Sequence, residues 1–134
     1  MGKDMIGMSN LSNFNFSTPI SSIIKEEKFF GRMNGPTSCA VFKGPCGDEM
    51  EFYLVIDDGK IIEAKCYTDG CKETKKCGLM VAYLVHNKTV NEALTISAGE
   101  VIKKLKNLSF EHQHCSILAV STLYRAIADY LLKK

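Results

Sequence analysis

The sequence predicts an α+β domain in which a three-stranded antiparallel meander has helices packed on one face. Two observations carry this prediction. Three segments with strand-type alternation follow one another in the first half of the chain, joined by turn sequences. After residue 70 the apolar residues change to the spacing of helices. Strands first and helices after favour a sheet covered on one side. With 134 residues, 46% of them hydrophobic, one domain can bury a real core.

The N-terminal part of the chain divides by composition. Residues 1–20 are rich in Asn, Ser and Met and are expected to form a mobile leader. Residues 21–134 are expected to form the single domain. A short helix is predicted from Ser21 or Ser22 to about Arg32, because the sequence Asn-Gly-Pro at 34–36 stops it.

Three strands are predicted at residues 38–43, 49–57 and 60–68. The second alternates clearly, with Met50, Phe52, Leu54 and Ile56 on one face. Asp-Gly at 58–59 is a hairpin turn of the favoured type. In the third strand Ile62, Ala64 and Cys66 are expected to share a face.

The connections of this meander bring two cysteines together. The turn after the first strand and the exit from the third strand lie at the same end of the sheet. Cys46 follows the first strand and Cys71 follows the third, so we expect them to lie about 5 to 10 Å apart.

Helices are predicted for the rest of the chain. The first runs from Cys71 to about His86, and two capping-box sequences, at 89–92 and 97–100, open two shorter ones. Residues 109–114 are expected to form a loop before a final helix that runs from Cys115 to the C-terminus. The side chains of this last helix that we expect to face inward are Val120, Leu123, Ile127, Tyr130 and Leu131.

Composition limits the function. The net charge of +2 gives no support for a nucleic-acid partner, and no apolar run approaches the ~18 residues of a membrane span. No segment has the pattern of a secretory signal, so we expect a reducing, cytoplasmic compartment. Clustered cysteines there indicate metal or thiol chemistry rather than disulfides.

Three of the six cysteines, Cys46, Cys71 and Cys115, are in expected loops or at helix starts. With Asp48 and His114 as hard-ligand neighbours, they predict a three-thiolate site for a soft metal or an iron–sulfur cluster. A functional cysteine needs a lowered pKa, and a helix N-terminus favours the thiolate at Cys71 and Cys115.

The other cysteines and histidines are interpreted as structural. Cys39 and Cys66 are in strands and are expected to be buried packing residues. A straight helix turns Cys77 away from Cys71, which favours a core position, and a nearby resolving thiol is the alternative. His86 and His112 are expected to be exposed, ordinary residues.

These residues resemble the U-type iron–sulfur cluster assembly scaffolds, the IscU family and the N-terminal domain of NifU. The resemblance covers roughly residues 34–132. The matching segments are Cys-Gly-Asp at 46–48, Gly-Cys at 70–71, Lys-Thr at 88–89 with Glu-Ala-Leu at 92–94, His-Cys-Ser at 114–116 with Leu-Ala at 118–119, and Ala-Ile at 126–127 with Asp-Tyr at 129–130.

The resemblance implies an IscU/NifU-N-like fold and a scaffold that is a carrier rather than a turnover enzyme. It would accept sulfur from a cysteine desulfurase, bind iron, build a transient 2Fe–2S cluster and transfer it to apo-proteins. Cys46, Cys71 and Cys115 would be the cluster-ligating thiolates, with Cys115 as the candidate sulfur acceptor. Asp48 would keep the cluster labile, and His114 would be a neighbouring metal ligand. Zinc can occupy the apo-scaffold.

The resemblance also bears on partners. The family's Leu-Pro-Pro-Val-Lys chaperone-recognition peptide is replaced at residues 108–112 by Leu-Ser-Phe-Glu-His. This departure argues against dependence on the dedicated Hsp70-type chaperone. A monomer or weak dimer is expected.

Two alternatives use the same residues. One is a zinc-dependent sulfurtransferase of the SufU type, in which Cys46, Asp48, Cys71 and Cys115 hold tetrahedral zinc and one thiolate relays sulfur. The other is a structural zinc-binding module. Because the ligand set is shared, the sequence does not separate the sulfurtransferase from the scaffold.

Overall fold

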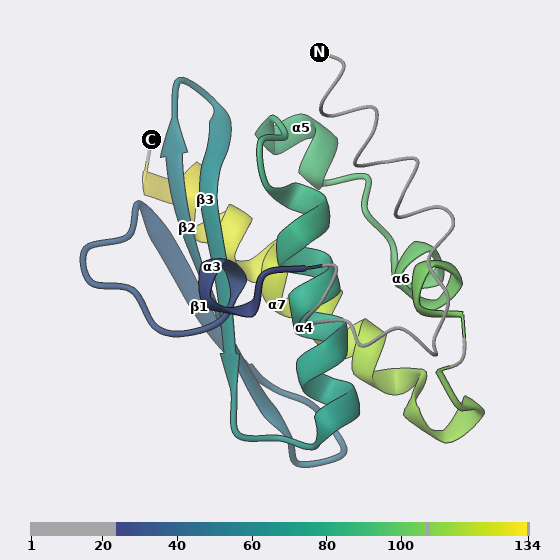
Figure 1. The fold of residues 1–134 in the computed structure, drawn as a ribbon. Helices are drawn as coiled ribbons and strands as arrows, with labels where there is room; N and C mark the ends of the chain where they lie inside the picture. The colour runs from purple at the N-terminus through teal and green to yellow at the C-terminus, as the bar shows by residue number, and fades with distance from the viewer. Residues whose placement is uncertain (1–23, 107, 134) are drawn as a thin grey trace.

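The computed structural model describes residues 24–106 and 108–133 (Figure 1). The leader predicted for residues 1–20 lies outside the described residues. Within them the predicted α+β class is confirmed, with three strands followed by helices. The elements in chain order are α3 (Glu26–Phe29), β1 (Ser38–Lys43), β2 (Glu49–Asp57), β3 (Lys60–Thr68), α4 (Lys72–Val85), α5 (Val90–Ala93), α6 (Ala98–Leu105), the 3-10 helix η1 (Phe110–His112) and α7 (His114–Lys133).

The sheet is the predicted antiparallel meander in the order β1-β2-β3. All three strands have the predicted bounds. The β2–β3 turn has positive φ angles of 53° at Asp58 and 75° at Gly59, as a type I′ hairpin turn requires. The inward face of β2 is fully buried at Met50, Phe52 and Leu54. One face of the sheet therefore forms half of the core.

A bulge in β3 changes one predicted orientation. Val55 pairs with Glu63 and Ile56 pairs with Ile61, so one residue of β3, Ile62, has no partner on β2. The extra residue reverses the alternation on its N-terminal side. Ile61 is consequently buried and Ile62 is 45% exposed, so the prediction that Ile62 shares a face with Ala64 and Cys66 is wrong.

Two long helices cover the inner face of the sheet. Helix α4 packs over β3, α7 packs over β1 and β2, and the two helices contact each other (Figure 1). A Cβ atom added at Gly78 of α4 would lie 2.9 Å from Cys66 Sγ and 3.0 Å from Met50 Cε. The missing side chain thus lets α4 approach the sheet closely. Helix α6 packs outside this pair, against both α4 and α7.

Helix α7 is apolar because it is a core helix. The stretch Phe110–Lys133, which spans η1 and α7, is long and apolar enough to cross a membrane by length and composition alone, but half of its apolar window is buried inside the domain. Val120, Leu123 and Ile127 face inward as predicted. Leu131 is 47% exposed, so its predicted inward orientation is wrong. It lies about 100° around the helix from half-buried Tyr130, off the buried stripe.

The short helices follow their capping sequences only in part. Helix α5 has the complete capping box, with reciprocal bonds between Thr89 and Glu92. At α6 the Glu100 N–H donates to Ser97 Oγ, and among the described residues this is the only bond of the predicted box. The helix predicted to reach Arg32 ends at Phe29, because Phe30 forms an isolated bridge with Cys66 of β3.

Candidate functional site

The cysteine site lies at the end of the sheet where β1 turns into β2 and β3 passes into α4. Cys71 is the N-cap residue of α4, and Cys115 is the second residue of α7. Helices α4 and α7 pack against each other on the sheet (Figure 1), and Thr74 Oγ1 in the first turn of α4 lies 3.4 Å from Cys115 Sγ at the start of α7. The predicted convergence of the three cysteine segments is a property of this packing.

A threonine that the sequence analysis did not single out connects three of the predicted ligands. Thr74 is fully buried, and its Oγ1 donates to Asp48 Oδ2 at 2.7 Å. The same oxygen lies 3.3 Å from Cys71 Sγ and 3.4 Å from Cys115 Sγ. A hydroxyl has one proton and two lone pairs, so one donated bond and two accepted S–H bonds use its full capacity.

The position of Thr74 follows from local helix geometry. Cys71 is the N-cap residue of α4, so Thr74 is residue N3. The side chains of these two positions face each other in the first turn of a helix. A Ser or Thr three residues after an N-cap cysteine is therefore a signal in the sequence that could have identified it. The sequence does not predict that Asp48 and Cys115 also lie next to this hydroxyl.

Asp48 and Cys46 are placed by the β1–β2 turn. A Cβ atom at Gly70 would lie 2.7 Å from Asp48 Oδ2, so glycine at this position leaves room for the carboxylate. Cys46 is exposed. A Cβ atom at Gly44 would lie 3.7 Å from Cys46 Sγ and 3.3 Å from Leu118 Cδ1, so the turn that holds Cys46 rests against the first turns of α7.

His114 is exposed, and its Nε2 lies 3.8 Å from Cys115 Sγ. It is therefore beside the cysteine site, on the side of Cys115. The structure thus brings Asp48, Cys71 and Cys115 into contact through Thr74 and places Cys46 and His114 at the periphery.

The pKa of the Cys115 thiol differs from the expectation. A helix N-terminus was expected to lower it, but burial raises it, and the neighbouring Cys71 and Cys46 raise it further. The hydrogen bond with Thr74 acts in the opposite direction and is the smaller effect. Desolvation and like charge outweigh the helix N-terminus here. Burial therefore favours the neutral thiol of Cys115 over its thiolate.

The remaining cysteines divide between the core and the surface. Cys66 is buried in β3, and burial raises its pKa to about 12. Cys77 is buried in the core as predicted, and burial together with the nearby Cys115 and Cys71 raises its pKa. Cys39 is exposed on β1, so its predicted burial is wrong; its N–H donates to the Asp129 carboxylate.

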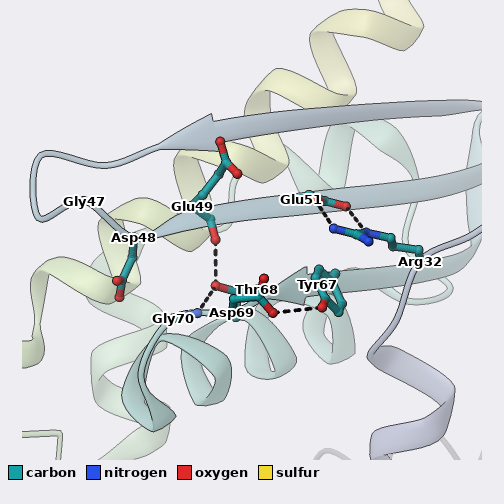
Figure 2. Close-up of a pocket in the computed structure, with 9 residues that line it drawn as sticks. All are labelled: Arg32, Gly47, Asp48, Glu49, Glu51, Tyr67, Thr68, Asp69 and Gly70. Carbon is teal, nitrogen blue, oxygen red and sulfur yellow. Dashed lines mark hydrogen bonds and ion pairs between the residues drawn. The ribbon is translucent and has the colours of Figure 1, made fainter.

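A polar cleft of about 190 Å³ adjoins the site, and Figure 2 shows Asp48 at one end and Arg32 at the other. Arg32 forms two hydrogen bonds with Glu51, of 2.9 and 3.0 Å, and lies over the Tyr67 ring. Arg32 holds the pKa of Glu51 below its usual value. Asp48 therefore lines an open polar cleft as well as accepting the hydrogen bond from Thr74.

Two more side chains that the sequence did not predict at the site lie near Cys71. Glu73 and His112 each place a ligand atom within 4.8 Å of Cys71 Sγ and of each other. His112 is half-buried, so the expectation that it is an ordinary exposed histidine is wrong. His86 is also half-buried, with its ring packed edge-on against Phe29.

The fold and the site together define a class: a small α+β domain with three cysteines and a carboxylate at one end of its sheet. The chain belongs to the NifU-like N-terminal domain family, whose profile matches residues 23–134. This match confirms the family resemblance predicted from the three cysteine segments.

Named relatives agree with this assignment. The chain is 38% identical over 88 residues to the iron–sulfur cluster assembly scaffold proteins IscU 1 and IscU 2 of Archaeoglobus fulgidus, covering 66% of this chain and 58% of each relative. It thus spans less than two thirds of these archaeal proteins. It is 37% identical over 90 residues to the scaffold protein IscU of Haemophilus influenzae, covering 66% of this chain and 71% of that protein.

Solved structures share the fold at lower identity. The NifU-like N-terminal protein of Brucella abortus aligns with a TM-score of 0.65 and 15% identity, covering 78% of this chain and 86% of that one. A putative iron–sulfur cluster assembly scaffold for the SUF system from Fervidobacterium islandicum aligns with a TM-score of 0.65 and 21% identity, covering 81% and 93%.

Proposed function

We propose that this protein is an iron–sulfur cluster assembly scaffold, a carrier that receives sulfur and iron and passes on a 2Fe–2S cluster. The observation that carries the proposal is the shared hydroxyl of Thr74, which holds the carboxylate of Asp48 and the thiols of Cys71 and Cys115 around one point. Three of the ligands implied by the family pattern are thereby gathered before any ion binds.

Sulfur would arrive as a persulfide on a cysteine desulfurase. A scaffold thiolate, with Cys115 as our candidate, attacks the outer sulfur of that persulfide. A new S–S bond forms on the scaffold, the old one breaks, and the desulfurase cysteine leaves as a thiolate. Because burial raises the pKa of Cys115, a base must first take its proton, and a cation bound to the sulfur would favour this loss.

Iron and sulfur are the cargo of the site. Cys46, Cys71 and Cys115 would ligate the cluster as thiolates, and Asp48 and His114 would supply the oxygen and nitrogen ligands. Each persulfide sulfur needs two electrons to leave as sulfide. Ferrous iron supplies one on becoming ferric, and an electron-donor protein must supply the other.

Oxygen and nitrogen ligands, which are harder than thiolates, suit a site that must release its cluster. A carboxylate binds iron less covalently than a thiolate does. Asp48 is half-buried and faces the open cleft, so an incoming acceptor ligand or water can replace it there. This arrangement supports transfer to apo-proteins rather than permanent storage.

The proposal also includes the domain, the compartment and the partners of the protein. Residues 21–134 would form the scaffold domain, acting in a cytoplasmic compartment as a monomer or weak dimer. Its partners would be a cysteine desulfurase and apo iron–sulfur proteins. The replaced chaperone peptide at residues 108–112 argues against a dedicated Hsp70-type partner.

Anaerobic reconstitution tests the proposal. Wild-type protein incubated with ferrous iron, cysteine and a desulfurase should develop the absorption and Mössbauer signals of a 2Fe–2S cluster. Cys46→Ala, Cys71→Ala and Cys115→Ala should each fail to hold a stable cluster. Cys66→Ala is the matched control, because it removes a buried thiol outside the site. Loss of the cluster in Cys66→Ala with retention in Cys46→Ala would contradict the ligand assignment.

A zinc-dependent sulfurtransferase is the second candidate. The observation in its favour is the donor count, since three thiolates and one carboxylate match a tetrahedral zinc site. The same reconstitution separates the two. Tight zinc with persulfide but no iron-bound sulfide would favour the sulfurtransferase, and no sulfur acceptance at all would leave a structural zinc module.

A further inference from the structure

Cys71 also belongs to a second set of side chains that can ligate a metal, besides its contact with Thr74. Cys71 Sγ, a Glu73 carboxylate oxygen and a His112 ring nitrogen all lie within 4.8 Å of one another. Glu73 is in the first turn of α4 and His112 ends η1, so two elements contribute. Neither residue belongs to the ligand set of the proposed cluster site.

The His112 ring is oriented as a metal-binding imidazole would be. Its Nδ1 lies 2.7 Å from Ser109 Oγ, and its Nε2 lies 3.8 Å from Glu73 Oε1. A histidine that binds metal through one nitrogen usually donates its other N–H to a fixed partner. Ser109 provides that partner, and Nε2 is left facing Glu73 and Cys71.

The three donor atoms lie within 4.8 Å of one another, and one pair already has nearly the spacing that an ion needs. Ligand bonds of about 2.0 to 2.3 Å in a tetrahedral site put neighbouring donors roughly 3.3 to 3.8 Å apart. The separation of His112 Nε2 from Glu73 already falls near this range. The side chains of Glu73 and His112 are 31% and 32% exposed, so an ion can enter from solvent.

An ion pair between Glu73 and His112, without a metal, is the simpler explanation of their contact. It does not explain why the third donor, the thiol of Cys71, lies beside them. Cys71 also contacts Glu73 as a hydrogen-bond partner, and its sulfur lies 3.3 Å from Thr74 Oγ1. One thiol is thus close to both groups of donors.

We propose that Cys71, Glu73 and His112 form a second binding site, which shares only Cys71 with the cluster site, for a divalent first-row transition ion, with zinc and ferrous iron as the ions that fit. A set of one sulfur, one nitrogen and one oxygen donor suits these ions rather than magnesium or calcium. Three protein ligands leave a fourth position open. The proposal does not rest on the scaffold function, because it requires only ion binding.

Cobalt(II) is the probe for the test, because it replaces zinc and shifts the NMR signals of protons near it. We expect the full-length protein to bind Co²⁺ and to show one shifted, exchangeable N–H proton from the His112 imidazole. His112→Gln should abolish this signal, and His114→Gln should retain it. Glu73→Gln and His112→Gln should each weaken Co²⁺ binding about tenfold or more.

The controls separate this site from the cluster site. Glu111→Gln removes a neighbouring exposed carboxylate on η1. Its Co²⁺ affinity should stay within about threefold of the wild type, because Glu111 is not a proposed ligand. The titrations are repeated in Cys46→Ala, which removes an exposed thiol of the cluster site only. Persistence of the His112 signal and of both affinity losses in that variant supports the proposal.

Three results would overturn it. They are no Co²⁺ binding, affinities unchanged by both Glu73→Gln and His112→Gln, or an imidazole signal that disappears with His114→Gln and survives His112→Gln. The last result would assign the imidazole to the cluster site and leave the scaffold function standing. Cluster reconstitution in the same variants is a separate measurement and tests only that function.

Discussion

Replacing Thr74 by valine should weaken metal binding as well as the fold. Valine has nearly the same shape but no hydroxyl, so Asp48 Oδ2 loses a donor at 2.7 Å and both sulfur atoms lose their contacts with Oγ1. A hydrogen bond to a charged group contributes about 1.5 to 3 kcal/mol. Half-buried Asp48 recovers part of this from water, so we expect the free energy of unfolding to fall by about 1 to 2 kcal/mol.

The larger effect should be on the ion. Side chains that orient metal ligands typically contribute 10- to 100-fold in affinity, which is about 1.4 to 2.8 kcal/mol. Zinc binding by Thr74→Val, measured by competition with a chromophoric chelator, should therefore weaken by about tenfold or more. Thr74→Ser keeps the hydroxyl and should bind zinc like the wild type, although it loses a buried methyl group that contributes about 1 kcal/mol to stability.

Thr122 provides a matched control on α7. It is fully buried, and its Oγ1 donates to the Leu118 carbonyl at 2.7 Å, away from the ligands. Thr122→Val should lower stability in urea unfolding without changing zinc affinity. If Thr74→Val also left zinc affinity unchanged, its hydroxyl would be a core hydrogen bond only, and the argument that it organises the ligands would be refuted.

Two further predictions concern carboxylates around the cleft. Asp48→Ala should give a longer-lived cluster that transfers more slowly to an apo-ferredoxin, because the weakest iron ligand is removed; Asp69→Ala, in the same cleft, is the control, and equal rates for wild type and Asp48→Ala would leave Asp48 as a turn residue. Arg32 lowers the pKa of Glu51 from 4.5, so this pair contributes stability that is present above pH 4.5 and is lost as the pH falls through the lower folded value. The urea midpoint of Arg32→Gln should accordingly lie below that of the wild type at pH 7, and the gap should close as the pH is lowered through the folded pKa of Glu51, whereas a constant gap would mean that Arg32 acts through packing.

Local patterns in the sequence were sufficient for most of the fold. The alternation from Glu49 to Asp57 and the Asp-Gly turn after it predict a strand followed by a hairpin. The predicted bounds of these strands agree with the structure. The meander then required Cys46 and Cys71 to come to one end of the sheet, since strand connectivity alone determines this. The family followed from the spacing of the three cysteine segments and was confirmed by the match to residues 23–134.

The predicted orientations of Ile62 and Leu131 were wrong. The bulge at Ile62 leaves the composition of β3 unchanged and still exchanges which isoleucine is buried. Leu131 has the residue type of the buried stripe of α7 and lies beside it. In both cases the burial of a side chain depends on the register of a neighbouring element, which a single segment does not encode.

The sequence by itself determined the order of strands and helices, the shared edge of Cys46 and Cys71, and the family. Only the tertiary structure decided which side chains meet there. The packing of α4 against α7 brings Thr74 to Cys115 across 41 residues, and the turn of η1 brings His112 to Glu73. It also raised the pKa of Cys115 where a helix N-terminus predicted the opposite. Desolvation and contact depend on what surrounds a group in space, and that is settled only when the helices dock on the sheet.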